Sequence, residues 1–232
     1  MNISQKSVMV VSPHQDDEVL GCGGLIASKQ EQNIPVQVVF ITDGAASHSW
    51  HPRFQAGEIV PIRKEEALKA LSILGIKPSQ IHFIDRPDGK LNFLNSVERQ
   101  QTIEQLAQLL QSFQPEEVYV THRHDRSEDH EATYKLVQEA IMFSEIKTDV
   151  LQYAIWMFCN FLTDGKVQLE DLAGAYRLSI HHVQDKKRQA IEAYSSQYLP
   201  IDAKSGAVLS RNFLRQFFLP YEVFFKLDSI QK

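Results

Sequence analysis

Short apolar runs rich in valine and isoleucine alternate along this chain with longer amphipathic stretches, and this alternation limits the possible folds most strongly. Such runs are typical of buried strands, whereas apolar residues at three- and four-residue spacings are typical of helices packed on a sheet. Repeated strand–helix units build a mostly parallel sheet, so we expect a doubly wound α/β fold. Strands are predicted at 7–11, 36–42, 81–85, 117–121, 151–156 and 176–183.

The helices are expected between and after these strands. A tail with many aromatic residues, 213–227, is expected to pack back on the core. No linker or repeat divides the 232 residues, so a single domain is expected over 1–232. Helical periodicity covers 23–32, 63–75, 95–113, 129–144 and 185–198.

Two polar clusters follow predicted strands. The carboxyl ends of parallel strands share one edge of a sheet, and ligands of doubly wound folds bind at that edge. The clusters are therefore expected to meet there. The first cluster follows strand 7–11 and contains His14, Asp16 and Asp17; the second follows strand 117–121 and contains His122, His124, Asp125, Asp129 and His130.

Imidazole and carboxylate groups in these clusters predict a metal site. A catalytic zinc ion takes three protein ligands and leaves one position for water, and two histidines with one aspartate complete such a set. Neighbouring side chains in a turning segment point in different directions, so Asp16 and Asp17 are not expected to bind one ion alike. One of them can be a ligand while the other faces the water as a general base.

Simpler interpretations of the same residues remain open. The glycines of "GCGG", 21–24, could form a phosphate-binding turn, although they do not match G-x-G-x-x-G and the preceding carboxylates would repel a pyrophosphate. His122 and His124 could be ordinary loop residues, and Asp129 or Ser127 could cap the following helix.

The stretch "SPHQDDEVLGCGG", 12–24, resembles the P-H-x-D-D-E signature of the LmbE-like (PIG-L type) zinc-dependent N-acetylglucosamine de-N-acetylases. The resemblance implies a three-layer Rossmann-like fold with a metal site at the C-terminal edge of the strands. In such a fold the glycines would let the chain turn closely past the metal into the first helix. Other blocks resemble the family in order: "ITDG" (41–44), "RKEEALKALSILGI" (63–76), "RPDGKL" (86–91), "DHEAT" (129–133) and "KRQAIEAYSSQ" (187–197).

The resemblance also implies a role for each residue that matches the family motif. His14, Asp17 and His130 fall on the metal-ligand positions, and Asp16 falls on the position of the general base. The implied cofactor is Zn²⁺, although Fe²⁺ or another divalent ion also suits two histidines and one carboxylate.

Three further positions follow from the same comparison of motifs. Arg63 and Asp88 match residues that contact the substrate in relatives, and Glu18 is expected to support the site rather than to bind the metal. Many relatives carry a histidine, which helps to stabilise the oxyanion, at the position of Ser127. That role would then pass to the metal alone or to His122, His124, His181 or His182.

The implied reaction is hydrolysis of an N-acetylglucosamine-type or related N-acetylated small molecule, which releases acetate and a free amine. Two alternatives are a non-catalytic sugar- or nucleotide-binding module and a zinc hydrolase that acts on another small-molecule amide. In the loop 45–62, His48, Trp50 and His51 could contact a sugar, but we expect them to be surface residues without that role. Trp156 is expected in the core.

Composition excludes some partners and indicates a compartment. The formal charge of −5 gives no general attraction for nucleic acid or an anionic membrane, so neither is expected as a partner. No integral membrane segment and no secretory leader is expected, and Cys22 and Cys159 are too few for a disulfide framework. The expected location is the cytoplasm, and a homo-oligomer is compatible with the sequence.

Overall fold

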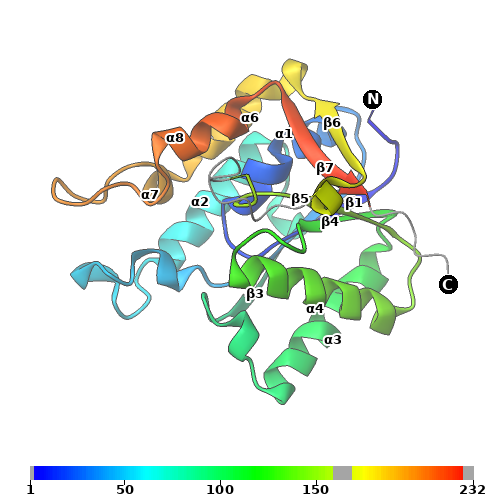
Figure 1. Ribbon diagram of the computed structural model, residues 1–232, viewed down its shortest axis with the longest axis horizontal. Helices are drawn as coiled ribbons and strands as arrows, with labels where there is room; N and C mark the ends of the chain where they lie inside the picture. Colours follow the sequence, from blue (N-terminus) through cyan, green and yellow to red (C-terminus); the bar gives the residue numbers. More distant parts are fainter. Residues whose placement is uncertain (1–2, 159–168, 227–232) are drawn as a thin grey trace.

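The computed structural model of the protein describes residues 3–158 and 169–226 (Figure 1). Helices cover both faces of a central sheet, which confirms the predicted α/β fold with a mostly parallel sheet. The strands are β1 (Val8–Ser12), β2 (Val36–Thr42), β3 (Ile81–Arg86), β4 (Glu117–Thr121), β5 (Asp149–Tyr153), β6 (Ala175–Ser179) and β7 (Tyr221–Lys226). The helices are α1 (Asp17–Glu31), α2 (Val60–Ile73), α3 (Ser96–Phe113), α4 (Glu128–Ser144), α6 (Gln184–Ala193), α7 (Ser195–Tyr198) and α8 (Arg211–Leu214).

The sheet has seven strands in the order β3-β2-β1-β4-β5-β7-β6. Strands β1 to β5 are parallel, whereas β7 is antiparallel to both β5 and β6. The order changes direction between β1 and β4, and ligands of such folds bind at this point, beyond the carboxyl ends of the strands.

Side chains of the central strand β1 alternate between two cores, as the period of a strand requires. Val8 and Val10 pack in one core with α1, α2 and α6, and Met9 and Val11 pack in the other with α3 and α4. Both faces of β1 are buried, which explains why its sequence is apolar throughout.

Helix α1 begins at Asp17, six residues before the predicted start at Gly23. The glycines of the motif therefore lie inside the helix, and the prediction that they let the chain turn into it is wrong. A Cβ atom at Gly24 would lie 2.5 Å from a side-chain carbon of Ile180, and one at Gly21 would collide with the ring of Tyr153. These two glycines allow α1 to pack closely on its neighbours.

The C-terminal region differs most from the predicted elements. The tail packs on the core as expected, but it also contributes β7, which was not predicted as a strand. Phe224 and Phe225 are both fully buried, so this strand lacks the alternation that marks a half-exposed one. The helix predicted at 185–198 is broken at Tyr194 into α6 and α7.

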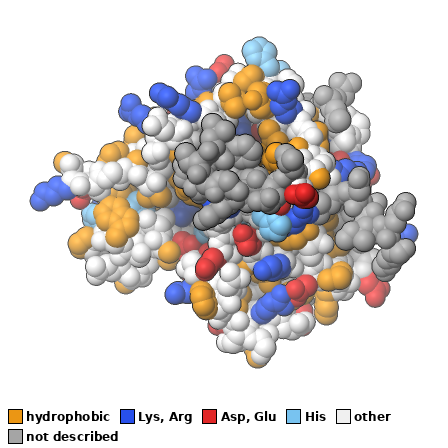
Figure 2. Space-filling view, in the orientation of Figure 1, with side chains coloured by type: hydrophobic (Ala, Val, Ile, Leu, Met, Phe, Trp, Pro, Cys, Tyr) orange, Lys and Arg blue, Asp and Glu red, His pale blue; other side chains and the backbone are white. Residues whose placement is uncertain are grey.

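Cys22 is buried and unpaired, whereas Cys159 lies outside the described residues. Among the residues described, helices that are both long and apolar enough to cross a membrane are absent. Acidic and basic side chains are interspersed over the face of the molecule that Figure 2 shows.

Candidate active site

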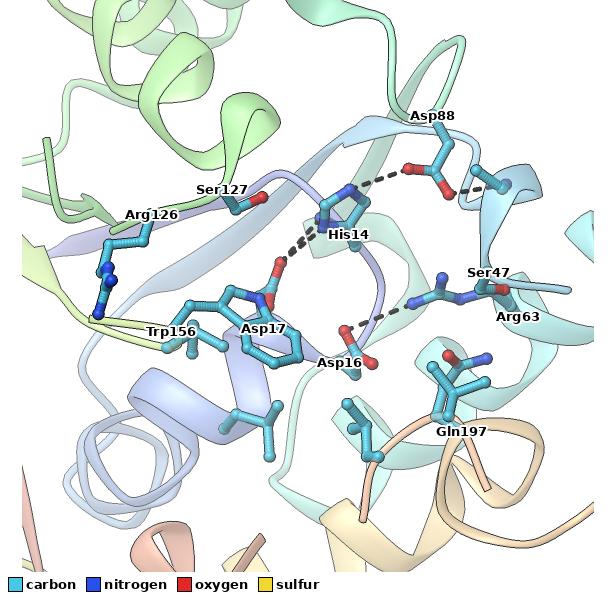
Figure 3. A pocket seen from close by; sticks show the side chains of 15 residues that line it. His14, Asp16, Asp17, Ser47, Arg63, Asp88, Arg126, Ser127, Trp156 and Gln197 are labelled. Atoms are coloured by element: carbon cyan, nitrogen blue, oxygen red, sulfur yellow. Dashed lines mark hydrogen bonds and ion pairs between the residues drawn. The ribbon is translucent and has the colours of Figure 1, made fainter. Parts of the chain in front are cut away.

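A cavity of about 440 Å³ opens beyond the carboxyl ends of β1 and β4, and Figure 3 shows the side chains that line it. Five of the six predicted site residues line this cavity, and the sixth, His130, lies directly behind Asp17 with no exposed surface. Sequence motifs that are more than 100 residues apart therefore meet at one edge of the sheet, as the parallel topology requires.

The three predicted metal ligands lie together. The ligand atoms of His14, Asp17 and His130 are all within 4.8 Å of one another. Asp17 Oδ2 lies 3.1 Å from His14 Nδ1 and 3.3 Å from His130 Nε2. His130 Nε2 is buried and has no hydrogen-bond partner among the described residues. This set offers two imidazole nitrogens and one carboxylate oxygen, which are ligands that zinc prefers. The unsatisfied His130 Nε2 also fits a site that a metal ion would complete.

Charges in this group shift the pKa values of its members. Burial alone would raise the pKa of Asp17, but His130 and His14 hold it below its usual value. Burial alone would lower the pKa of His130, but Asp17 and Asp125 raise it to about 9. These contacts therefore favour the ionised carboxylate of Asp17 and the protonated imidazole of His130. Such shifts are expected where a carboxylate faces imidazoles away from solvent.

The other ring nitrogen of each histidine contacts a carboxylate. His130 Nδ1 lies 2.7 Å from Asp125 Oδ2, and His14 Nε2 lies 3.0 Å from Asp88 Oδ1 and 3.3 Å from Asp129 Oδ2. Such carboxylates fix the tautomer and the orientation of ligand histidines.

His14, Asp88 and Asp129 form a second group that could hold an ion. Asp129 already accepts backbone N–H groups from Gly89 (2.6 Å) and Leu91 (3.1 Å), and Asp88 Oδ2 accepts the backbone N–H of Ala46 (2.8 Å). These two carboxylates therefore already bind backbone N–H groups of the loops around the site and contact the ring of His14. Asp129 does not cap α4, and the side chain of Ser127 makes no capping hydrogen bond either.

Asp16 lies beside the ligand group in an unusual backbone conformation, with φ 138° and ψ −32°. Its backbone N–H donates to Glu18 Oε2 at 2.9 Å, and the hydroxyl of Tyr194 donates to the other carboxylate oxygen of Glu18. Positive φ is costly for a residue with a side chain and persists only where its surroundings impose it. Glu18 and Tyr194 are both buried and supply that constraint.

The carboxylate of Asp16 faces the cavity and contacts the guanidinium of Arg63. Its Oδ1 lies 3.4 Å from Arg63 Nη2 (Figure 3). Burial raises the pKa of Asp16 to about 7, and the guanidinium of Arg63 opposes the shift. Burial also raises the pKa of Glu18 to about 8, although Tyr194 donates to it. Arg63 itself is buried and donates to the backbone carbonyls of Gln15 and Gly44.

The histidines that were predicted as replacements for the family histidine lie elsewhere. His122 packs on the ring of Phe225, and His124 Nδ1 lies 2.6 Å from Asp171 Oδ1. None of His122, His124, His181 and His182 is among the described residues that line the cavity. Ser127 does line it, and so does its neighbour Arg126, which has a positive φ of 62°.

Other residues of the cavity wall were not predicted. Trp156, expected in the core, lines the cavity, as do Gln197, Val208 and Leu209. The sequence did carry a signal for two of them, because Trp156 ends a predicted strand and Gln197 ends the block 187–197. In contrast, Trp50 is 54% exposed and does not line the cavity, in agreement with its prediction as a surface residue. The same prediction is wrong for His48, which is buried.

Known proteins resemble this chain in sequence and in fold. A sequence profile of the PIG-L family, described as GlcNAc-PI de-N-acetylase, matches residues 9–141. A probable N-acetyl-alpha-D-glucosaminyl L-malate deacetylase 2 from Bacillus anthracis is 27% identical over 203 residues, which cover 84% of this chain and 83% of the relative. A 4-oxalmesaconate hydratase from Pseudomonas putida is 31% identical over 150 residues, 62% of this chain and 55% of the relative.

A solved structure shares the fold. The N,N'-diacetylchitobiose deacetylase from Pyrococcus horikoshii, in complex with an inhibitor, superposes with a TM-score of 0.68 at 22% identity, over 91% of this chain and 76% of that protein. The family profile matches more than half of the 232 residues and includes both polar clusters. The chain therefore belongs to the PIG-L family.

Proposed function

We propose that this protein is a metal-dependent N-deacetylase, in one domain over 1–232, that acts on an N-acetylglucosamine-type or related N-acetylated small molecule. One observation carries the proposal: the ligand atoms of His14, Asp17 and His130 lie together at the cavity, with the carboxylate of Asp16 beside them. The name of the Bacillus anthracis relative, a deacetylase of a glucosaminyl malate, supports the substrate class.

We propose Zn²⁺ as the ion, held by His14, Asp17 and His130, with Fe²⁺ as an alternative for the same donor set. When bound, the ion would act as a Lewis acid on the attacking water and on the acetyl carbonyl. The carboxylates on the far ring nitrogens, Asp125 and Asp129, would keep both imidazoles in the ligand orientation.

Asp16 would transfer the proton. Its carboxylate takes a proton from the water as the water oxygen attacks the carbonyl carbon of the N-acetyl group. It then gives that proton to the amide nitrogen as the C–N bond breaks, so that acetate and a free amine leave. Glu18 holds the backbone N–H of Asp16, which fixes the carboxylate toward the cavity.

Arg63 and Asp88 are proposed to position the substrate. Both line the cavity next to the ligand group, Arg63 beside Asp16 and Asp88 beside His14. The hydroxyl of Ser127 lies at the position of the family histidine and supplies a hydrogen-bond donor at the cavity wall. A serine donor is weaker than an imidazolium, so the bound ion is expected to carry more of the oxyanion charge.

A second candidate function comes from the Pseudomonas putida relative, which is named a hydratase. The same base and ion could add water to a carbon–carbon double bond of an unsaturated oxo acid. That reaction releases no amine and no acetate, so the two functions are separated by their products.

The test is release of primary amine from a panel of N-acetylglucosamine conjugates, measured with fluorescamine. Protein loaded with zinc is compared with protein treated with a chelator and with chelated protein to which zinc is returned. We expect amine release that the chelator removes and zinc restores. Absence of amine from every substrate, together with hydration of an unsaturated oxo acid, would favour the hydratase.

A further inference from the structure

Both polar and apolar side chains line the cavity. His14, Asp16 and Asp88 are among the polar ones. The apolar ones are led by Trp156 and include Leu20, Ile155, Val208 and Leu209. In Figure 3, Trp156 lies on the side of His14 that is away from Asp88, where Arg126 and Ser127 also lie.

Trp156 is held rigidly in this wall. The carboxylate of Asp125 accepts the backbone N–H groups of Ile155 (2.9 Å), Trp156 (3.1 Å) and Met157 (3.0 Å) through one oxygen. These bonds take the chain out of β5 after Tyr153, although the sequence predicted a strand to 156. The carboxylate of Asp125 also forms a hydrogen bond with the ring of His130. One side chain therefore holds both a predicted metal ligand and the segment of Trp156.

The indole of Trp156 is also fixed from behind. It stacks on the ring of Phe213, with centroids 4.4 Å apart and planes inclined by 25°. One face of the indole is thereby covered, yet the side chain is only half-buried and lines the cavity. An aromatic group that is immobilised and still open to a polar pocket is suited to contact an apolar face of a ligand.

We propose that Trp156 is a platform for the C–H face of a pyranose ring, which makes the site selective for cyclic N-acetylated amino sugars over acyclic N-acetylated amines. This inference rests on the proposed deacetylase function. A pyranose directs hydroxyl groups outward from its edge and presents C–H groups on its faces. It therefore matches a cavity that is lined both by polar groups and by an indole. An acyclic polyol has no such face.

Intrinsic fluorescence tests the platform directly, because the chain has only two tryptophans, Trp50 and Trp156. In a Trp50→Phe variant loaded with zinc, all tryptophan emission comes from Trp156. We expect methyl N-acetylglucosaminide to change the emission intensity or maximum in a saturable way. We expect N-acetylglucosaminitol, which has the same N-acetyl group and no ring, to leave the emission unchanged. Unchanged emission with the glycoside, or equal changes with both compounds, would overturn the proposal.

Kinetics provide the second arm. Trp156→Ala should lower kcat/KM for methyl N-acetylglucosaminide about tenfold or more, mainly through KM, because the apolar contact is lost. Its kcat/KM for N-acetylglucosaminitol and its zinc content should stay within about twofold of the unsubstituted protein, and Trp156→Phe should restore most of the loss. Equal losses on both compounds would overturn the platform. If the unsubstituted protein releases amine from no substrate, the deacetylase proposal fails, and the fluorescence titration still decides the role of Trp156.

Discussion

Replacing Asp125 with alanine should destabilise the protein and weaken metal binding together. Asp125 is fully buried, and its carboxylate accepts hydrogen bonds from the ring of His130 and from three successive backbone N–H groups, those of Ile155, Trp156 and Met157. When the side chain is truncated to alanine, these donors lose their shared acceptor and no other acceptor takes its place.

The size of the effect follows from the groups that would be left unpaired. His130, Ile155 and Met157 are all at most 1% exposed, so water reaches their N–H groups poorly. A buried donor without a partner costs about 1–3 kcal/mol. Three such donors predict that Asp125→Ala lowers the free energy of unfolding by about 3–5 kcal/mol, because the site can relax partly. Loss of the carboxylate behind a ligand histidine should also weaken metal affinity by about 10- to 100-fold.

Urea denaturation of the metal-free protein measures the first effect, and metal titration of the folded protein measures the second. Both are needed because bound metal itself stabilises the folded state. Asp149→Ala is the matched control: this carboxylate forms ion pairs with Lys6 (2.7 Å) and Lys226 (3.2 Å), but its side chain is 36% exposed. We expect the control to cost less than about 1 kcal/mol. A loss below 1 kcal/mol for Asp125→Ala, with unchanged metal affinity, would refute the reasoning.

Three further substitutions test two other buried carboxylates and the tyrosine that donates to one of them. Glu18→Ala should lower kcat about tenfold or more with KM and metal content unchanged, because the side chain that accepts the strained backbone N–H of Asp16 is lost. Tyr194→Phe should act in the same direction, because Tyr194 donates to Glu18. Wild-type kcat in both variants would show that Asp16 needs no such support. Glu222→Ala should lower the free energy of unfolding by about 3–5 kcal/mol, because the buried ammonium of Lys187 loses the carboxylate that lies 2.7 Å from it. A thermal or urea melt measures this change, and a loss under about 1 kcal/mol would mean that Lys187 finds another partner.

Local sequence signals were sufficient for six of the seven strands described and for the placement of the candidate site. His14, Asp17 and His130 follow strands that are far apart in the chain, and parallel topology alone predicted that they meet. Their distances agree with the predicted ligand set, and their roles remain predictions.

Features that depend on tertiary packing were not predictable in this way. The strand β7 was missed because burial of both faces removes its alternation, and the motif glycines were misread because their neighbours, Tyr153 and Ile180, come from distant elements. Trp156 packs partly on the core, as predicted, but its place in the cavity wall was not predictable, since its backbone N–H bonds Asp125, about thirty residues earlier.

The most direct test of the proposed mechanism is amine release by an Asp16→Asn variant whose metal content is measured in the same preparation. Asparagine keeps the shape of the side chain and cannot accept the proton. We predict that the variant still binds one metal ion through His14, Asp17 and His130, and that kcat falls by about 10²–10⁴-fold. Amine release at the native rate by the metal-loaded variant would contradict the assignment of Asp16 as the base.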